Sequence, residues 1–214
     1  MIKRNKGLLI LTSAIMLLPI IVGLLLWDKL PEKVPVHWNV AGEVDGWGSK
    51  AMVVFGLPLF ILATHWVCTF ATALDPKNQE INTKVVHLVL WICPCLSLVC
   101  NTFVYAATLG YDLSIQIIMP LLFGLLFMVI GNLAPKCKRN YTIGMKLPWT
   151  LNDEENWNKT HRFGGKVWLI GGAVIVATAV LGNFIIFFGI IILMIILPTI
   201  YSYVYYRKHP KTVE

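Results

Sequence analysis

Charged side chains are scarce in this chain. Of its 214 residues, 14% are Asp, Glu, Lys or Arg and 57% are hydrophobic, and the mean hydropathy is +0.71. Ordinary soluble domains contain about 25% charged and about 45–50% apolar residues. A chain of this length cannot bury so much apolar surface in one water-soluble core. The shortage of charge therefore excludes a soluble domain and predicts an integral membrane protein.

Six apolar stretches reach the roughly 20 residues that a helix needs to cross the hydrocarbon core of a bilayer. They cover residues 7–27, 51–74, 85–109, 115–134, 167–183 and 184–206. The last two form one continuous run, which we divide at Gly182 and Asn183 because a single helix of that length would overshoot the bilayer. The sequence therefore predicts an all-α integral membrane protein with six transmembrane helices.

Lys and Arg are nearly absent from one side of the predicted spans. With the N-terminus inside, fifteen of the eighteen cationic residues fall on the cytoplasmic side, and only Lys29, Lys33 and Lys50 fall outside. This asymmetry predicts that both termini are cytoplasmic in a bacterial plasma membrane. Topology and contact with anionic lipid account for the net charge of +7. Membrane lipid is therefore an expected partner, and direct nucleic-acid binding is not expected.

The predicted spans contain no Asp, Glu, Lys or Arg away from their ends. Proton-coupled pumps and ion carriers usually place such groups at depth, where they bind the ion or relay the proton. This absence argues against a coupled transporter but does not exclude a passive pore. Two histidines, His65 and His87, do lie in spans. We expect each to hydrogen-bond to a neighbouring helix as a neutral imidazole, with a ligand or proton-transfer role as the alternative.

The predicted outer loops contain no cysteine, which excludes an extracellular disulfide framework within one chain. Cys93 and Cys95 flank Pro94 in the third span. Such a triplet suits Cu(I), because thiolates are soft ligands. A proline kink flanked by small apolar thiols explains the triplet more simply. We therefore predict no metal site and no cofactor, with Cys93 and Cys95 as the alternative candidates for metal ligands.

Recognisable catalytic motifs are also missing. The chain has no G-x-x-x-x-G-K-S/T, G-x-S-x-G or H-E-x-x-H pattern and no C-x-x-C pair. These patterns supply a phosphate cradle, an activated serine, a zinc site and a redox pair. The sequence therefore predicts a protein that is not an enzyme.

One compact polar loop, residues 28–50, separates the first two spans. Pro31 and Pro35 favour extended backbone and oppose a helix. Gly42, Gly46 and Gly48 permit positive φ, so we expect two sharp turns within ten residues.

Aromatic rings predict that this loop lies in the outer headgroup layer. The tryptophans concerned are Trp27, Trp38 and Trp47. His37, Glu43 and Asp45 could form a metal or acid–base cluster. The interpretation that we favour is that these three groups fix the loop through local hydrogen bonds.

The longest inner loop, residues 135–166, contains a helix start. Asn152 is the candidate N-cap and Glu155 completes a capping box. Trp157 and His161 then lie one turn apart on one helix face, and Gly164–Gly165 forms a flexible joint before the fifth span. Three tryptophans are expected to hold this element in the inner interface, namely Trp149, Trp157 and Trp168. The loop is a lipid-anchored elbow, a docking surface for a cytoplasmic partner, or a support for a binding site between helices.

Two motifs resemble known families. Residues 31–50 read P-x-x-V-P-x-H-W-N-x-x-G-x-x-D-G-W-x-x-K and resemble the extracytoplasmic loop of a bacterial membrane family of unassigned function, which often precedes SdpI-like proteins. Residues 140–166 resemble the signature of the SdpI family, immunity proteins against a sporulation-delaying toxin. The matching positions are Gly144, Pro148, Trp149, Thr150, Leu151, Trp157, Lys159, Thr160, His161, Arg162 and Gly165. Lys146 and Leu147 depart from the pattern, where arginine and threonine are common. A lysine would hold a phosphate or carboxylate less specifically than the planar arginine.

The resemblance implies a membrane immunity protein that binds and neutralises a membrane-active peptide toxin at the outer face and relays occupancy to a cytoplasmic regulatory protein. It implies a two-helix module, residues 1–74, and a four-helix SdpI-like region, residues 75–214. The expected outer-loop binding residues are Pro35, His37, Trp38, Asn39, Gly42, Asp45 and Trp47. The inner-loop motif residues are Gly144, Lys146, Pro148, Trp149, Thr150, Trp157, His161 and Arg162. The alternatives are a small transporter or exporter of a toxin or metal ion, and an intramembrane enzyme using His37 or His161 with nearby carboxylates.

Overall fold

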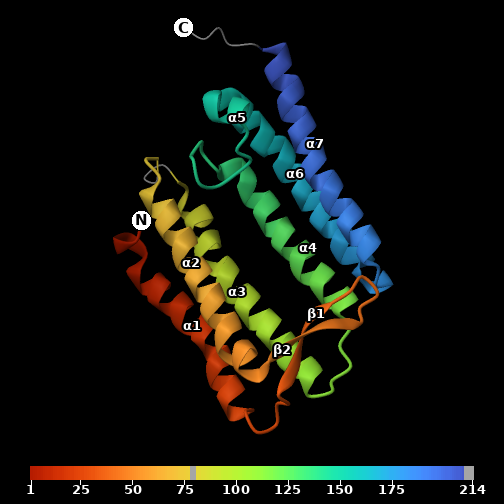
Figure 1. The fold of residues 1–214 in the computed structure, drawn as a ribbon. Coiled ribbons are helices and arrows are strands. Elements are labelled where there is room, and N and C mark those ends of the chain that lie inside the picture. Colours follow the sequence, from red (N-terminus) through yellow and green to blue (C-terminus); the bar gives the residue numbers. More distant parts are fainter. Residues whose placement is uncertain (78–80, 210–214) are drawn as a thin grey trace. The chain divides into compact units, whose positions relative to one another are not determined.

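The computed structural model describes residues 1–77 and 81–209, and most of them are helical (Figure 1). The α-helices are α1 (Lys6–Leu25), α2 (Leu57–Leu74), α3 (Thr83–Thr108), α4 (Ile115–Leu133), α5 (Pro148–Asn152), α6 (Glu154–Thr178) and α7 (Phe184–Lys208). The shorter helical turns are η1 (Lys3–Asn5), the π-helical η2 (Met52–Gly56), η4 (Ala134–Lys136) and η5 (Ala179–Leu181). The strands are β1 (Lys33–Trp38) and β2 (Val44–Ser49).

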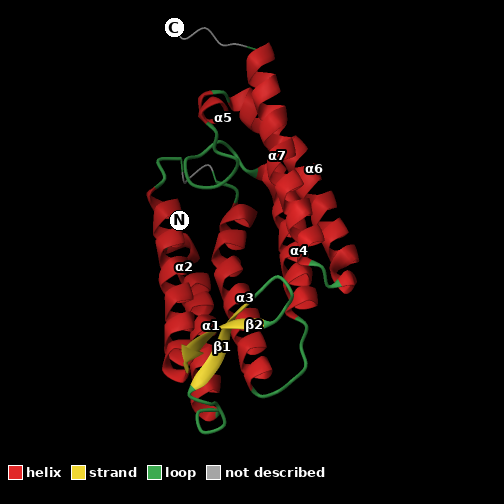
Figure 2. Cartoon of the chain, turned by 45° about the vertical axis from the view of Figure 1, so that its right-hand side comes forward, coloured by secondary structure: helices red, strands yellow, loops and turns green. Residues whose placement is uncertain are grey.

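Within residues 1–77 and 81–209, six helical segments are long and apolar enough to cross a membrane. They are Lys3–Leu25, Met52–Leu74, Thr83–Thr108, Ile115–Lys136, Glu154–Leu181 and Phe184–Lys208. The six-span prediction is therefore confirmed by length and composition. The fifth span belongs to α6, which begins at Glu154 rather than at residue 167. The inner-loop helix and the fifth span are therefore one continuous helix. The strictly all-α prediction omitted the strand pair β1–β2, which Figure 2 draws in yellow.

The described chain falls into two compact units. Unit 1 consists of residues 1–74 and 86–115, and unit 2 consists of residues 75–85 and 116–214 as far as they are described. Lys211, one of the cations counted on the cytoplasmic side, lies outside the described residues. The division of the sequence into modules 1–74 and 75–214 stays a prediction.

In unit 1, α1 packs against α2 through polar as well as apolar side chains. Thr12 Oγ1 of α1 lies 3.3 Å from His65 Nε2 of α2, and both side chains are fully buried. His65 thus makes the expected hydrogen bond between helices. His87 is exposed on α3, so the same expectation stays a prediction there.

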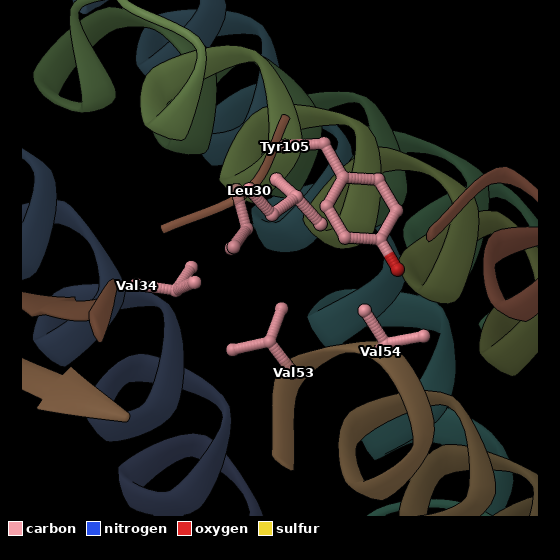
Figure 3. Close-up of a cluster of buried hydrophobic side chains, with 6 residues drawn as sticks. Leu30, Val34, Val53, Val54 and Tyr105 are labelled. Atoms are coloured by element: carbon pink, nitrogen blue, oxygen red, sulfur yellow. The ribbon is translucent and has the colours of Figure 1, made fainter. Parts of the chain in front are cut away.

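An apolar cluster fastens the loop after α1 to the helices of unit 1 (Figure 3). Its buried members are Leu30, Val34, Val53, Val54, Val104 and Tyr105. They come from the loop, β1, η2 and α3. Tyr105 also reaches α1, where its hydroxyl donates to the carbonyl of Pro19 over 2.9 Å. The polar loop is therefore a packed extension of unit 1.

In unit 2, α4 and α6 approach closely at paired glycines. A Cβ added at Gly165 would lie 2.7 Å from the carbonyl oxygen of Gly131, and one at Gly172 would lie 2.6 Å from that of Gly124. Small residues at facing positions are a common way for membrane helices to pack. The expected flexible joint at Gly164–Gly165 is therefore wrong, since α6 runs through both glycines without interruption.

The turn between α6 and α7 occurs where the apolar run was divided. Gly182 adopts a left-handed conformation with φ of 56°. The Asn183 side chain then caps α7 by accepting hydrogen bonds from the backbone N–H groups of Ile185 and Ile186.

Candidate functional site

The loop after the first span is a β-hairpin. β1 and β2 pair antiparallel, with Lys33 opposite Ser49 and Trp38 opposite Val44. The connection closes when Asn39 N–H donates to the carbonyl of Glu43, and Gly42 supplies the positive φ of 82°. Two sharp turns were expected, but Gly46 and Gly48 lie in the extended β2, so the chain reverses once.

His37 and Asp45 face each other across this hairpin. Their Nδ1 and Oδ1 atoms lie 2.5 Å apart, and their side chains are 70% and 43% exposed. Gly46 makes the pairing possible, because a Cβ there would lie 2.6 Å from His37 Cβ. Glu43 is bound instead to Asn39 Nδ2 at 3.2 Å. His37 with Asp45, and Glu43 with Asn39, therefore form two separate local hydrogen-bonded pairs. The loop-fixing interpretation expects such local bonds.

The predicted outer-loop residues divide by exposure. Pro35 is buried, and Trp38 is half-buried with its ring centroid 5.0 Å from that of Phe103 on α3. Trp47 is 60% exposed. His37, Asp45 and Trp47 are thus accessible side chains of the hairpin, and we call these three residues the hairpin face. Pro35 and Trp38 hold it on unit 1.

His161 organises the inner-loop motif in unit 2. Its Nδ1–H donates to the carbonyl of Trp157 over 2.8 Å, and its Nε2 accepts the backbone N–H of Met145 over 2.9 Å. A carbonyl only accepts and an amide N–H only donates, so these partners fix a neutral imidazole with the proton on Nδ1. The ring stacks on Trp157 at 4.1 Å, which confirms that both lie on one face of α6. A ring with both nitrogens occupied is not arranged as a catalytic base.

Trp157 is a core residue of unit 2. It is fully buried, and its Nε1–H donates to the carbonyl of Cys137 over 2.8 Å. The expectation that Trp157 anchors the loop in the interface is therefore wrong. Burial raises the pKa of the Cys137 thiol to about 11, although the Asn140 side-chain amide opposes this by donating to the sulfur. This thiol is thus protonated and hidden.

The start of α6 differs from the expected start by one residue. Asp153, rather than Asn152, is the N-cap, and its Oδ1 accepts the backbone N–H of Glu155 over 3.0 Å. Asn152 instead ends the short α5, which Pro148 begins. The fully buried Thr150 hydroxyl accepts the N–H of Leu147 and closes the first turn of α5. Two helices meeting at Asp153 replace the single helix start that the sequence indicated.

A buried polar network ties the inner loop to α7. Trp149 Nε1–H donates to Ser202 Oγ over 2.7 Å, and Ser202 Oγ–H donates to Asn156 Oδ1 over 3.1 Å. Asn156 Oδ1 also accepts from the Thr160 hydroxyl. Each of these groups has a protein partner within the packed interior, so the network specifies how α5, α6 and α7 pack together.

Asp75, which the sequence did not single out, holds a second contact of the inner loop. Its Oδ2 accepts the N–H of Tyr141 and the hydroxyl of Thr142, and its Oδ1 accepts the N–H of Lys77. Burial raises the pKa of this carboxyl, but the hydrogen bonds from Thr142, Lys77 and Tyr141 outweigh it and hold the pKa below its ordinary value. Asp75 sits at the end of an apolar run, and that position gave no signal of its partner 66 residues away.

The inner-loop motif residues also divide by exposure. Lys146, Pro148 and Arg162 are exposed, whereas Thr150, Trp157 and His161 are buried. Gly144 has a φ of 120° and lies against the rings of Trp157 and His161. Thr150, Trp157 and His161 therefore form the packed part of the motif, and Gly144, Lys146, Pro148 and Arg162 form its exposed part.

The Cys93-Pro94-Cys95 triplet does not bring its thiols together. Cys93 is buried and Cys95 is exposed, because residues two apart on a helix point to different sides. Among the described residues, no group of three or more His, Cys, Asp or Glu side chains could hold a metal ion.

Six apolar helices and two structured loops in the described part of the chain define a multi-pass membrane protein. Its resemblance to the SdpI family is confirmed, because residues 136–202 match the SdpI/YfhL protein family and residues 14–62 match a domain of unknown function, DUF1648. The chain is 27% identical over 209 residues to "Immunity protein SdpI" of Bacillus subtilis (strain 168), covering 96% of this chain and 97% of that protein. No solved structure matches. The matched family is not an enzyme family.

Proposed function

We propose that this chain is an immunity protein of the bacterial plasma membrane that binds and neutralises a membrane-active peptide toxin without catalysis. The observation that carries the proposal is similarity along 96% of the chain to a protein named for immunity. Similarity of that extent includes both loops as well as the spans. Membrane immunity is the property that the two proteins would share.

The orientation in this proposal has both termini in the cytoplasm. The strong bias of Lys and Arg toward one set of loops supports it. The β-hairpin is then extracytoplasmic, and residues 137–153 are cytoplasmic. A toxin that attacks the cell from outside would meet the hairpin face first.

The hairpin face has the chemistry to bind an amphipathic peptide. Trp47 offers a large exposed ring, and the paired His37 and Asp45 offer hydrogen-bonding groups beside it. Aromatic anchors at a surface commonly dominate binding energy. Packing of the hairpin on unit 1 reduces the entropy lost on binding, because the face is already ordered. Capture there would keep the toxin from inserting into the bilayer.

Survival of a sensitive bacterial strain tests this proposal. Cells expressing the chain are challenged with sporulation-delaying-type toxin peptides, beside cells expressing Trp47→Ala or His37→Ala. We expect protection by the parent chain and weaker protection by both variants at equal membrane expression. Tyr141→Ala is the matched control, since Tyr141 is 57% exposed on the inner loop. Loss of protection with the control alone, or no protection by the parent chain, would contradict the proposal.

The same challenge separates toxin capture from transport. Cys95→Ala and His87→Ala change exposed side chains in the middle and at the start of α3. Capture at the hairpin predicts full protection by both variants. An exporter that uses these groups would lose protection.

A relay to a cytoplasmic regulatory protein is the second element of the proposal. The exposed Lys146, Pro148 and Arg162 would contact that regulator, and toxin binding would change their presentation. Burial of Cys137 offers a readout, because its thiol reacts only when the inner loop opens. A variant retaining Cys137 as its single cysteine should react faster with a maleimide when toxin is bound. An unchanged labelling rate would argue against the relay and leave capture standing.

A further inference from the structure

Unit 2 contains a pocket that toxin capture does not use, and of its lining residues only Lys146 also belongs to the proposed contact with a regulator. Its cavity volume is about 190 Å³, and it lies between the loop segment 145–147, α6 and α7. Pockets that enclose a whole small ligand usually measure about 300–1,000 Å³. This pocket therefore suits one part of a larger molecule whose remainder lies outside it.

One end of the pocket is cationic. Lys146 lines it, is exposed, and forms no salt bridge within the described part of the chain. Its Nζ donates to the backbone carbonyl of Tyr141 over 3.3 Å, which leaves two ammonium protons for another acceptor. Thr160 and Thr199 also line the pocket, but their hydroxyls already donate to Asn156 Oδ1 and the Ile195 carbonyl. An anionic group entering here would therefore pair with Lys146.

The other walls are apolar and continue into the outer face of α7. Ile195 is 56% exposed, and Trp168 is half-buried with its indole N–H already bound to the carbonyl of Met194. Pro198 completes this wall. Since α7 is one of the six membrane-spanning helices, the acyl chains of the bilayer lie against its exposed side chains. A molecule in the pocket thus meets hydrocarbon at one end and a cation at the other.

We propose that this pocket binds an anionic phospholipid. The phosphate pairs with Lys146, and the adjoining part of one acyl chain lies against Trp168, Ile195 and Pro198. Lysines near an anionic membrane surface commonly make such contacts. The bound lipid would brace the segment 145–147 against α6 and α7, the same segment whose Met145 is held by His161.

Native mass spectrometry of the full chain in detergent tests the proposal. The protein is titrated with phosphatidylglycerol, with phosphatidylcholine, and with inorganic phosphate alone. We expect preferential retention of phosphatidylglycerol, and a decrease of about fivefold in its affinity for Lys146→Gln, the size expected for one lysine at an anionic surface. Lys146→Arg should keep the preference. Lys138→Gln is the matched control, because Lys138 is an exposed lysine of the same loop outside the pocket.

A second pair of variants tests the apolar wall independently of charge. Thr199→Phe fills the pocket from an exposed position and should weaken retention of phosphatidylglycerol, whereas Ile192→Phe, exposed on α7 outside the pocket, should not. Thermal unfolding of both variants verifies that they fold. Equal retention of the two lipids by the parent chain, or equal losses with Lys138→Gln and Lys146→Gln, would overturn the proposal. Tight binding of inorganic phosphate alone would also overturn it, because it would identify a free anion as the ligand.

Discussion

The backbone N–H of Met145 donates to Nε2 of His161 over 2.9 Å, and this bond joins the inner loop to α6. The other ring nitrogen is bound to the carbonyl of Trp157, one turn earlier in the same helix. His161 is 1% exposed, so water cannot replace either partner. The histidine that stands out in the motif is therefore a structural link, and the exposed motif residues around it are those available to a partner.

Replacing His161 tests this link. His161→Phe keeps an aromatic ring against Trp157 but leaves the Met145 N–H without an acceptor. Leaving one buried polar group unpaired costs about 1–3 kcal/mol, and we expect thermal unfolding in detergent to reveal a loss of that size. His87→Phe, at an exposed site on α3, should change stability little. Equal effects of the two variants would contradict the structural role.

Gly144 should tolerate no side chain. Its φ of 120° is strained for other residues, and an added Cβ would collide with His161 and come within 3.0 Å of Trp157. We expect Gly144→Ala to lower the free energy of unfolding by about 1–3 kcal/mol, from backbone strain alone. Gly189→Ala is the control, because a Cβ there meets nothing within 4 Å and helix propensity favours alanine. Thermal unfolding of the two purified variants makes the comparison, and a stable Gly144→Ala would refute the argument.

Asp75 should make stability depend on pH in the acid range. Its pKa is lowered on folding, so the stabilisation is complete above the unfolded value of about 3.9 and is lost as pH falls through the folded pKa. Asp75→Asn should therefore be less stable than the parent chain at neutral pH, with the difference shrinking below about pH 4. Thermal unfolding between about pH 3 and pH 7 measures this. A stability difference between Asp75→Asn and the parent chain that stays constant over this range would contradict the argument.

Trp168 and Pro198 should be energetically coupled. Pro198 has no N–H, so the carbonyl of Met194 lacks its helical donor, and Trp168 Nε1–H donates to it instead over 2.9 Å. Trp168→Phe should destabilise the protein by about 1–2 kcal/mol. In a Pro198→Ala background the restored backbone N–H serves Met194, so the same change should have a smaller effect. A double-mutant cycle by thermal unfolding measures the coupling, and strictly additive effects would disprove it.

Several structural features could be predicted from the sequence because their causes are local. Spans follow from runs of apolar residues, and the turn before α7 follows from Gly182 and Asn183, whose backbone and capping chemistry act within a few residues. The pairing of Trp157 with His161 follows from helical spacing. The extended backbone around Pro35 follows from its ring. These predictions needed no knowledge of what lies elsewhere in the chain.

Other features were misjudged because distant neighbours decide them. Gly164–Gly165 has the composition of a joint, but Gly165 packs against α4 and Gly164 lies against Met145 and Pro198, so both positions need a small residue. Trp157 has the composition of an interface anchor, but the carbonyl of Cys137 and the loop around it enclose the ring. Asn152 and Asp153 can both cap a helix. Because Asn152 is the last residue of α5, Asp153 is the N-cap of α6.

The sequence by itself determined that this is a six-span membrane protein with one polar loop after the first span and one motif-bearing loop before the fifth, because hydrophobic length and local turn chemistry act over short distances. Only the tertiary structure decided which loop residues are exposed to solvent and which are buried by packing. It left His37, Asp45 and Trp47 accessible on the hairpin and buried Thr150, Trp157 and His161 in unit 2. The physical reason is that a buried polar side chain must find a hydrogen-bond partner, and partners such as Asp75 for Thr142 come from parts of the chain far away in sequence.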